Sequence, residues 1–336
     1  MATIKDVAKK AGVSVSTVSI VINGKSKERS IPEATQEKVA KAMAELGYQP
    51  NQTARRLRTK DEQRPVIAFY WPLDFRVPIL ASFLNSLQRE IDRTGFACEL
   101  VIQPYQNDHL DMSEDSILRN GYSGIILGAL TEKDLQYMEK LNPPVPVVLI
   151  NRTSEIFSTV GTDNEEIGIS AAAAFRRSGK NRVAVFASAQ SYLATMRRVD
   201  AFLEACRQMG ITVEEGDIFH SPSTIEGGFA SAEAFCGRED RPDAVFCDSD
   251  SIALGALSCF SQRGIQVPEE VAVLTISMLE PEYTAYSIPP LSVVEMPNED
   301  IGKAALNLIR QKIETGSKKP THLTFNAALI MRKSMG

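Results

Sequence analysis

The sequence predicts an α/β protein with a small all-α headpiece at the amino terminus and a two-lobed core of parallel sheets flanked by helices. In the first 50 residues, apolar positions follow helical spacing and are interrupted by glycine. From Pro65 onward, short apolar runs alternate with amphipathic stretches, and the alternation begins again after Asn164. Such alternation is typical of parallel sheets covered by helices on both faces. A chain of 336 residues has room for two or three units at roughly 100–200 residues per domain.

The first two predicted helices flank a glycine. Thr3 stands three residues before Asp6, a capping pattern at a helix start, and Gly12 is the residue type that turns a chain most cheaply. Ser14 is placed to cap the second helix, which ends at Asn23. The apolar residues at helical spacing are Ile4, Val7, Ala8 and Ala11 in the first helix and Val18, Val21 and Ile22 in the second.

A third helix is predicted from near Pro32 to Leu46, just before Gly47. Two short helices joined by a short turn, with a third closing the small core, form a helix-turn-helix unit of the kind that enters the major groove of DNA. Hydroxyls on the second helix can bond phosphates or base edges, and Val15 can touch a thymine methyl group. A generic three-helix interaction module is the alternative interpretation. The residues that this helix presents are Ser14, Val15, Ser16, Thr17, Ser19 and Ile20.

Charge is distributed unevenly along the chain. Residues 1–60 hold twelve basic and five acidic residues, whereas the rest holds 25 basic and 37 acidic ones, for a net charge of −5. A basic head on an acidic body suggests that the head meets a polyanion. The alternative is a solvated basic surface, but the charge, the turn and the hydroxyl-rich helix together favour double-stranded DNA.

The core is predicted as a series of alternating strands and helices. The strands are expected at 66–71, 96–103, 124–127, 147–150, 183–187, 244–247 and 271–276. The helices are expected at 79–94, 164–178, 196–209 and 249–263. Two lobes of this kind place a ligand between them, at the carboxyl ends of the strands.

Composition excludes several other classes of protein. Hydrophobic residues make up 43% and charged residues 24% of the chain, which is ordinary for a globular protein and excludes disordered and collagen-like chains. No apolar run approaches the ~20 residues of a membrane span, and the first residues lack the apolar region of a secretion signal. The cysteines are odd in number and show no CxxC spacing, so we expect free thiols, no membrane partner and a cytoplasmic location. They are Cys98, Cys206, Cys236, Cys247 and Cys259.

Seven runs of residues carry a further signal: 3–19, 46–51 and 54–58 in the head, and 145–152, 160–164, 264–273 and 289–291 in the core. These runs resemble the LacI/GalR (lactose-repressor) family of bacterial transcription regulators. The resemblance implies a helix-turn-helix DNA-binding headpiece at 1–48, a hinge helix and linker at 49–63, and a two-lobed, periplasmic-binding-protein-like effector-binding and dimerisation domain at 64–336. It also implies three crossings between the lobes, near residues 160, 290 and 320.

The resemblance assigns DNA contacts by position. Val15 and Ser16 would read bases, and Ile20 stands where relatives often carry Arg or His, so one polar base contact is expected to be missing. The loop 24–30 is longer than usual, and either adds backbone contacts or is a surface insertion. The residues assigned to DNA are Thr3, Ser14, Val15, Ser16, Thr17, Ser19, Ile20, Asn23, Tyr48, Asn51, Ala54, Arg55, Leu57 and Arg58.

Residues 52–58 are too short for an autonomous helix, because isolated helices under ~12–15 residues are marginal in water. The resemblance implies that this segment becomes helical on DNA, where two copies lie in the minor groove and Leu57 wedges between base steps. Apolar wedges of this kind unstack and kink DNA. Arg55 and Arg58 would contact the backbone or the groove. A plain basic linker is the alternative.

The same resemblance points to a ligand site that departs from the sugar-binding pattern. Arg198 matches a family arginine and is the strongest pocket candidate. Asn151, Ser249 and Ser277 stand where relatives carry Asp, Asn and Asp, so three polar contacts are shortened or neutralised.

The predicted first strand ends in four further candidates. Trp71 and Phe75 either stack on a ligand ring or belong to the core. Arg76 either pairs with an anionic group or lies at the surface, and Asp74 can accept hydroxyl bonds. A sugar or sugar derivative is the expected effector, and a phosphorylated one fits if two arginines converge.

Enzyme signatures are absent from the sequence. His109, His220 and His322 have no metal-ligand spacing, and no phosphate-binding loop or nucleophile elbow occurs. We therefore predict no catalytic residue, metal or cofactor. The prediction is a homodimeric regulator, most simply a repressor, that binds a pseudo-palindromic operator and is controlled by a small molecule as inducer or corepressor. The alternative is a corepressor- or partner-dependent regulator or activator with a non-sugar effector. A transport solute-binding module would need a secretion signal and no DNA-binding head.

Overall fold

The computed structural model describes residues 4–22, 26, 29–46, 64–189 and 193–336. Its contacts divide the chain into two units. One is the headpiece unit, residues 1–64 together with 119–121, and the other is the core unit, residues 65–118 and 122–336.

The described residues of the headpiece form three helices, α1 (Ile4–Ala11), α2 (Val15–Ile22) and α3 (Glu33–Leu46). Gly12 adopts a left-handed conformation with φ of 67°, and the N–H of Val13 donates to the carbonyl of Ala8 at 3.0 Å, which closes α1. The three helices bury a small common core. Its buried members are Val7, Ala8, Val18, Val39 and Ala42. The predicted helix-turn-helix is thus confirmed.

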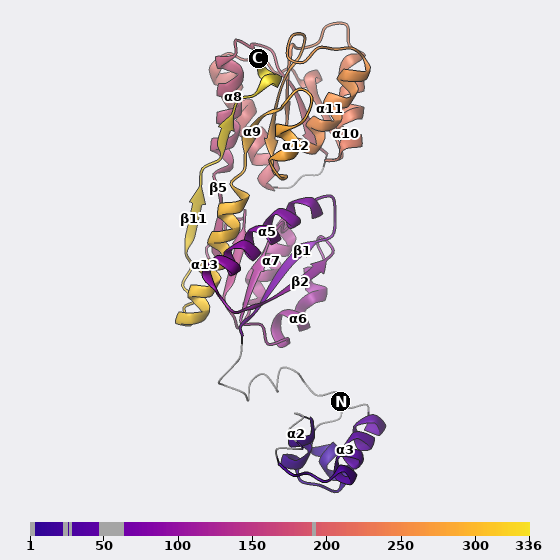
Figure 1. Ribbon diagram of the computed structural model, residues 1–336. Helices are drawn as coiled ribbons and strands as arrows, with labels where there is room; N and C mark the ends of the chain where they lie inside the picture. Colours follow the sequence, from indigo (N-terminus) through magenta and orange to yellow (C-terminus); the bar gives the residue numbers. More distant parts are fainter. Residues whose placement is uncertain (1–3, 23–25, 27–28, 47–63, 190–192) are drawn as a thin grey trace. The chain divides into compact units, whose positions relative to one another are not determined.

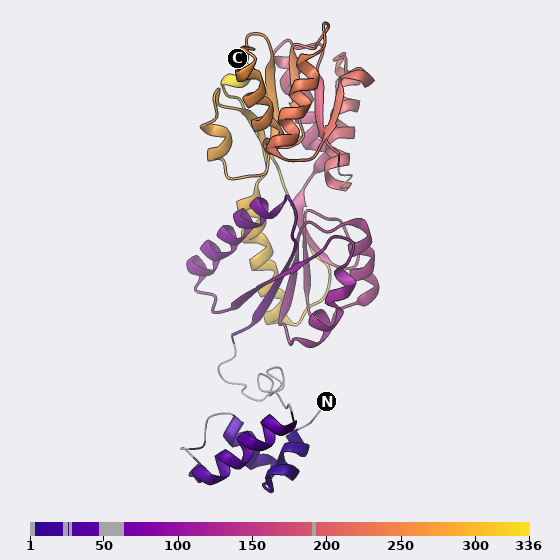
Figure 2. The same cartoon turned by 90° about the vertical axis from the view of Figure 1, so that its right-hand side faces the viewer.

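The N-lobe contains a six-stranded sheet in the order β11-β5-β4-β3-β1-β2, in which every pair is parallel. Helices α5 (Val77–Thr94) and α13 (Asn298–Thr315) lie side by side against one face (Figures 1 and 2). Helices α6 (Glu114–Arg119) and α7 (Glu132–Leu141) cover the other face. The strands are β1 (Val66–Pro72), β2 (Glu99–Tyr105), β3 (Gly124–Leu127), β4 (Val147–Ile150), β5 (Ser158–Thr162) and β11 (His322–Phe325).

The C-lobe repeats this architecture with the order β12-β10-β9-β8-β6-β7, and only β12 runs antiparallel to its neighbour. Helices α8 (Asn164–Arg177) and α9 (Leu193–Met209) cover one face, and α10 (Ile225–Cys236) and α11 (Asp250–Gln262) cover the other. A short helix, α12 (Glu282–Ala285), follows β9. The strands are β6 (Ala184–Ser188), β7 (Ile218–Ser221), β8 (Ala244–Cys247), β9 (Ala272–Ser277), β10 (Ser292–Glu295) and β12 (Ala328–Ile330).

The chain passes between the lobes three times. It leaves the N-lobe after β5, returns after β10 through α13, and leaves again after β11 for β12. These passages lie within a few residues of the expected positions near 160, 290 and 320. Because most strands are parallel, their carboxyl ends gather at one edge of each sheet, and these edges supply the lining described below.

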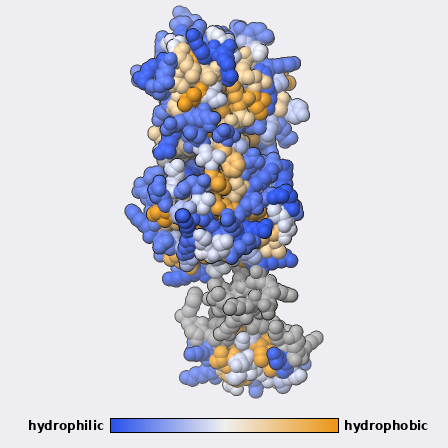
Figure 3. All heavy atoms as spheres, turned by 90° about the vertical axis from the view of Figure 1, so that its left-hand side faces the viewer, coloured by the Kyte–Doolittle hydropathy of each residue, from blue (hydrophilic) through white to orange (hydrophobic). Residues whose placement is uncertain are grey.

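The surface of the core is mostly hydrophilic on the side shown in Figure 3, where apolar atoms gather in separate patches. Single exposed apolar side chains such as Ile169 on α8 and Leu323 on β11 are ordinary for a folded protein. Within the described ranges, no helix combines the length and the apolar character needed to cross a bilayer.

Candidate functional sites

Helix α2 is capped and oriented as a reading helix requires. The Ser14 hydroxyl accepts a hydrogen bond from the N–H of Thr17 at 3.0 Å, which confirms the predicted cap. Val18 is fully buried, so the opposite face points away from the headpiece core. That face includes Val15, which is 38% exposed, and the exposed Ser16.

The other α2 residues assigned to DNA, Thr17, Ser19 and Ile20, are partly exposed. The helix carries no acidic residue in its first turn and no basic residue in its last, so its contacts depend on hydroxyl and apolar groups. The remaining assigned residues lie outside the described part of the chain, and the hinge and its wedge stay predictions. They are Thr3, Asn23, Tyr48, Asn51, Ala54, Arg55, Leu57 and Arg58.

A cavity between the two lobes of the core, called the cleft below, is lined at the carboxyl ends of strands. The ends of β1 and β4 reach it from the N-lobe, and the ends of β6 and β8 reach it from the C-lobe. The lining of the cleft comprises Trp71, Phe75, Arg76, Ile79, Phe83, Ala129, Ile150, Asn151, Arg152, Ser188, Ala194, Thr195, Arg198, Ser223, Asp248, Ser249, Met278, Met296 and Asn298.

Six of the eight residues predicted for the ligand site line the cleft: Trp71, Phe75, Arg76, Asn151, Arg198 and Ser249. The other two do not. The hydroxyl of Ser277 donates to the carboxylate of Asp250 at 3.2 Å, which keeps it within the C-lobe. The carboxylate of Asp74 is occupied by Arg76, two residues along the same turn.

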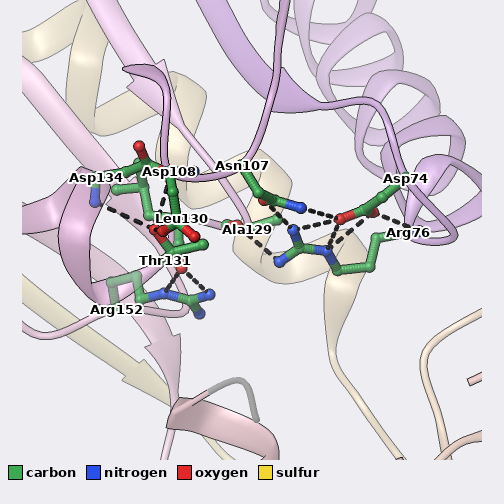
Figure 4. A network of polar contacts seen from close by, with 9 residues as sticks. All are labelled: Asp74, Arg76, Asn107, Asp108, Ala129, Leu130, Thr131, Asp134 and Arg152. Carbon is green, nitrogen blue, oxygen red and sulfur yellow. Dashed lines mark hydrogen bonds and ion pairs between the residues drawn. The ribbon is translucent and has the colours of Figure 1, made fainter. Parts of the chain in front are cut away.

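Arg76 is part of a closed polar network (Figure 4). Its guanidinium forms an ion pair with Asp74 at 2.6 Å, and also donates to the side chain of Asn107 and to the carbonyl of Ala129, both at 2.7 Å. Burial raises the pKa of Asp74, but hydrogen bonds from Arg76 and Asn107 outweigh it and leave that pKa below its ordinary value. Arg76 is buried in the lining, so the alternative of a surface residue is wrong. Its charge is already paired with Asp74, and its contact with a ligand anion stays a prediction.

Arg152 follows β4 and belongs to the same lining. Figure 4 shows its contact with Leu130. Its Nε and Nη2 donate to the carbonyl of Leu130, and its Nη1 donates to the carbonyl of Asn151 at 2.7 Å. Burial lowers the pKa of Arg152 to about 10, and the nearby Arg76 and Arg198 charges act in the same direction. The sequence analysis did not select this residue, although its place directly after a buried strand was a usable signal.

Arg198 on α9 lies in the cleft, as predicted, and is only 3% exposed. Its Nε donates to the side-chain oxygen of Asn164 at 2.8 Å, and its Nη1 faces the sulfur of Met278 at 3.5 Å. Burial lowers the pKa of Arg198 to about 10.

Asp248 is an acidic group of the lining that the sequence analysis missed in favour of its neighbour Ser249. One carboxylate oxygen accepts the N–H of Ser188 at 2.6 Å, and the other has no partner among the described residues. Burial raises the pKa of Asp248 to about 6. Ser249 accepts a hydrogen bond from Ser223 at 3.0 Å.

Trp71 belongs to the core of the N-lobe and also lines the cleft, and its stacking on a ligand ring stays a prediction. It is 2% exposed and contacts Phe69 and Phe83, with ring centroids 5.7 and 5.6 Å away. It also forms part of the cleft wall, where its Nε1–H lacks a hydrogen-bond partner within the described residues.

The part of the chain that the structure describes contains no group of three or more His, Cys, Asp or Glu side chains able to hold a metal ion.

Comparison with known proteins agrees with this architecture. Residues 3–51 match "Bacterial regulatory proteins, lacI family", and residues 172–335 match "Periplasmic binding protein-like domain". The HTH-type transcriptional repressor PurR of Vibrio atlanticus (strain LGP32) is 30% identical over 343 residues, which cover 100% of this chain and 99% of the relative. The same repressor of Actinobacillus pleuropneumoniae serotype 3 (strain JL03) is 28% identical, with coverages of 100% and 98%.

Solved structures give the same picture. A LacI family transcription regulator from Clostridium acetobutylicum is 31% identical, with a TM-score of 0.77, over 80% of this chain and 100% of that one. The transcriptional regulator CelR in complex with cellobiose is 26% identical, with a TM-score of 0.69, over 99% and 100%. The lac repressor dimer bound to operator and the anti-inducer ONPF shares the fold, at 22% identity and a TM-score of 0.72 over 99% of both chains.

A helix-turn-helix headpiece joined to a two-lobed core with a cleft defines a DNA-binding transcription regulator rather than an enzyme. The chain belongs to the lacI family of bacterial regulatory proteins and is a DNA-binding transcription repressor of that family.

Proposed function

We propose that the protein is a homodimeric repressor whose two headpieces bind a pseudo-palindromic operator and whose affinity for that operator is set by a small molecule in the cleft. The observation that carries this proposal is a ligand-sized cleft lined from both lobes, on a chain that also carries a capped, outward-facing reading helix. A ligand that touches both lobes binds one lobe arrangement better than another, and so shifts the equilibrium between them. The coupling to DNA in such systems is typically about 1–3 kcal/mol.

A sugar or sugar derivative, possibly phosphorylated, is the proposed effector class. The neighbour solved with cellobiose supports a sugar, and the mixture of aromatic rings and hydrogen-bonding side chains in the cleft suits one. The ligand acts either as an inducer or as a corepressor. A partner-dependent regulator with a non-sugar effector is the second candidate, because three of the polar positions differ from the family's sugar-binding pattern.

Dimerisation is proposed because a two-fold operator matches a two-fold protein. The related lac repressor structure is a dimer on its operator. On the C-lobe, the α12 segment exposes Tyr283, Tyr286 and Ile288 by 53%, 84% and 89%, which suits a surface covered by a second copy. Sedimentation analysis of the purified protein tests this. A monomer at micromolar concentration would contradict it.

The operator is tested by incubating the full-length protein with sheared genomic DNA from its source and sequencing the retained fragments. We expect a few sites that share a two-fold motif. Ser16→Ala, which removes a hydroxyl from the exposed face of α2, should weaken their recovery, whereas Thr35→Ala on α3 should not. If sites appear only after small molecules from a cell extract are added, the protein is corepressor-dependent. No enrichment in either condition contradicts the proposal.

A further inference from the structure

We propose that the effector carries an oxyanion, a phosphate or a carboxylate, which binds between Arg152 of the N-lobe and Arg198 of the C-lobe. This inference rests on the proposed role of the cleft as the effector site and specifies the chemistry of the ligand.

The charge balance of the cleft is the first argument. Among the described residues of its lining are three arginines and one carboxylate. The charge of Arg76 is neutralised by its ion pair with Asp74 (Figure 4). In the ranges that the structure describes, Arg152 and Arg198 form no salt bridge; the charge of Asp248 attracts Arg198, and the charge of Glu132, outside the lining, attracts Arg152. Within the described lining, these two guanidinium groups thus share a single carboxylate, that of Asp248. Burying a charge without a counter-charge costs free energy. A ligand anion would provide the second counter-charge that the cleft lacks, and its binding is favoured for that reason.

The unused donors are the second argument. Arg198 donates one hydrogen bond to the side-chain amide oxygen of Asn164 and one to the thioether sulfur of Met278, which is a weak acceptor. Arg152 donates only to backbone carbonyls, and Trp71 has a free indole N–H in the cleft wall within the same ranges. A planar guanidinium with free N–H groups matches the paired oxygens of a phosphate or a carboxylate.

The carboxylate of Asp248 indicates which second group the ligand carries. The free carboxylate oxygen of Asp248 accepts but does not donate when ionised. A hydroxyl or amine on the ligand would satisfy it. The lining therefore suits a molecule with an oxyanion at one end and a hydrogen-bond donor at the other, as in a sugar phosphate or a sugar acid.

An anion between Arg152 and Arg198 would also change which arrangement of the two lobes is more stable. Arg152 and Arg198 belong to different lobes, and the pKa of Arg152 is lowered in part by the charge of Arg198, which means that the two groups repel. An oxyanion between them replaces this repulsion with two attractions. Ligand binding therefore favours the arrangement in which the lobes approach each other.

The chain provides its own reporter for a test. Trp71 is the single tryptophan of the sequence, and it lines the cleft. Titrating the full-length protein with inorganic phosphate, at ionic strength held constant with NaCl, should give a saturable change in tryptophan emission. A parallel titration with acetate distinguishes the two sources of oxyanion, because the one that saturates at the lower concentration identifies the preferred group. If neither anion produces a saturable change, the proposal is wrong.

Variants of the two arginines test whether the anion that changes the tryptophan emission binds between Arg152 and Arg198. Arg152→Met and Arg198→Met should each reduce the affinity for the anion at least tenfold. Arg207→Met, on the same helix as Arg198 but 77% exposed at its side chain and paired with Glu204, should retain the wild-type affinity. Far-UV circular dichroism verifies that each variant is folded, and the wild-type titration decides the question if one is not. An equal response in all variants would overturn the assignment. Operator capture is measured separately, both without and with small molecules from a cell extract, so a failure here with capture intact in either condition rejects this inference and leaves the proposed repressor standing.

Discussion

At the scale of single residues, the Asp74–Arg76 pair holds the turn that carries the cleft wall. Asp74→Asn leaves the Arg76 guanidinium buried, at 7% exposure, without its counter-charge. Breaking a buried ion pair on one side costs about 3–5 kcal/mol, so we expect a loss of that size in the free energy of unfolding measured by urea denaturation. Asp300→Asn, which removes an exposed carboxylate 3.9 Å from Lys303, is the matched control and should cost at most about 1 kcal/mol. Equal losses would refute the role of the pair.

Asp248 makes stability depend on pH in the direction opposite to most carboxylates. Burial raises its pKa from 3.8 to about 6, so the folded protein holds this proton more tightly than the unfolded chain does. The contribution of Asp248 to the free energy of unfolding is therefore greatest below pH 4 and falls by about 3 kcal/mol as the pH rises to about 6. The difference between wild type and Asp248→Asn, followed by thermal unfolding from pH 4 to 7, should show this fall. A difference that does not change with pH would contradict it.

At the scale of elements, α10 and α11 approach so closely that only glycine fits at their contact. A Cβ added at Gly255 would overlap the carbonyl oxygen of Ile225. This is a backbone atom, so a change of side-chain rotamer cannot relieve the overlap. We expect Gly255→Ala to lower the free energy of unfolding by about 1–3 kcal/mol or more, as overpacking does. Gly237→Ala is the control, because its added Cβ would meet its nearest atom at 3.5 Å, an ordinary contact. Chemical denaturation compares the two.

The sequence was sufficient to predict the buried strands but not the edges of the sheets. The strands β3, β4 and β8 have the predicted bounds, because each is a short, fully buried apolar run. In contrast, β7 and β11 lie at sheet edges, are four residues long and mix polar with apolar types, so neither contains an apolar run that marks it as a strand. A tertiary partner, rather than the local pattern, makes these segments strands.

The same reason explains which cleft residues were found. Arg198 was predicted from a family motif, whereas Arg152 and Asp248, which directly follow buried strands, were not selected. Their burial depends on the second lobe, which no local pattern reveals. The pairing of Arg76 with Asp74 was missed because both were considered as separate ligand contacts.

At the scale of the whole molecule, the hinge should distinguish operator from other DNA. Leu57→Ala removes the predicted wedge, and we expect operator affinity to fall about tenfold or more, which is roughly 1.4 kcal/mol. Affinity for unrelated DNA should change little, because phosphate contacts supply it. Binding isotherms on both DNAs over a range of salt concentrations measure this. An equal loss on both kinds of DNA would rule out the wedge.

The three passages between the lobes determine the order in which a growing chain can fold. The C-lobe strands β6 to β10 are contiguous in sequence and can pair early, but β11 and β12, the last strand of each sheet, arrive only with the final fifteen residues. The pairing of β11 with β5 must close a loop that contains nearly the whole C-lobe, and long-range closure of this kind is slow unless the intervening segment is already compact. A chain that stops short of residue 322 would therefore lack one strand in both lobes at once, so premature termination leaves no intact half.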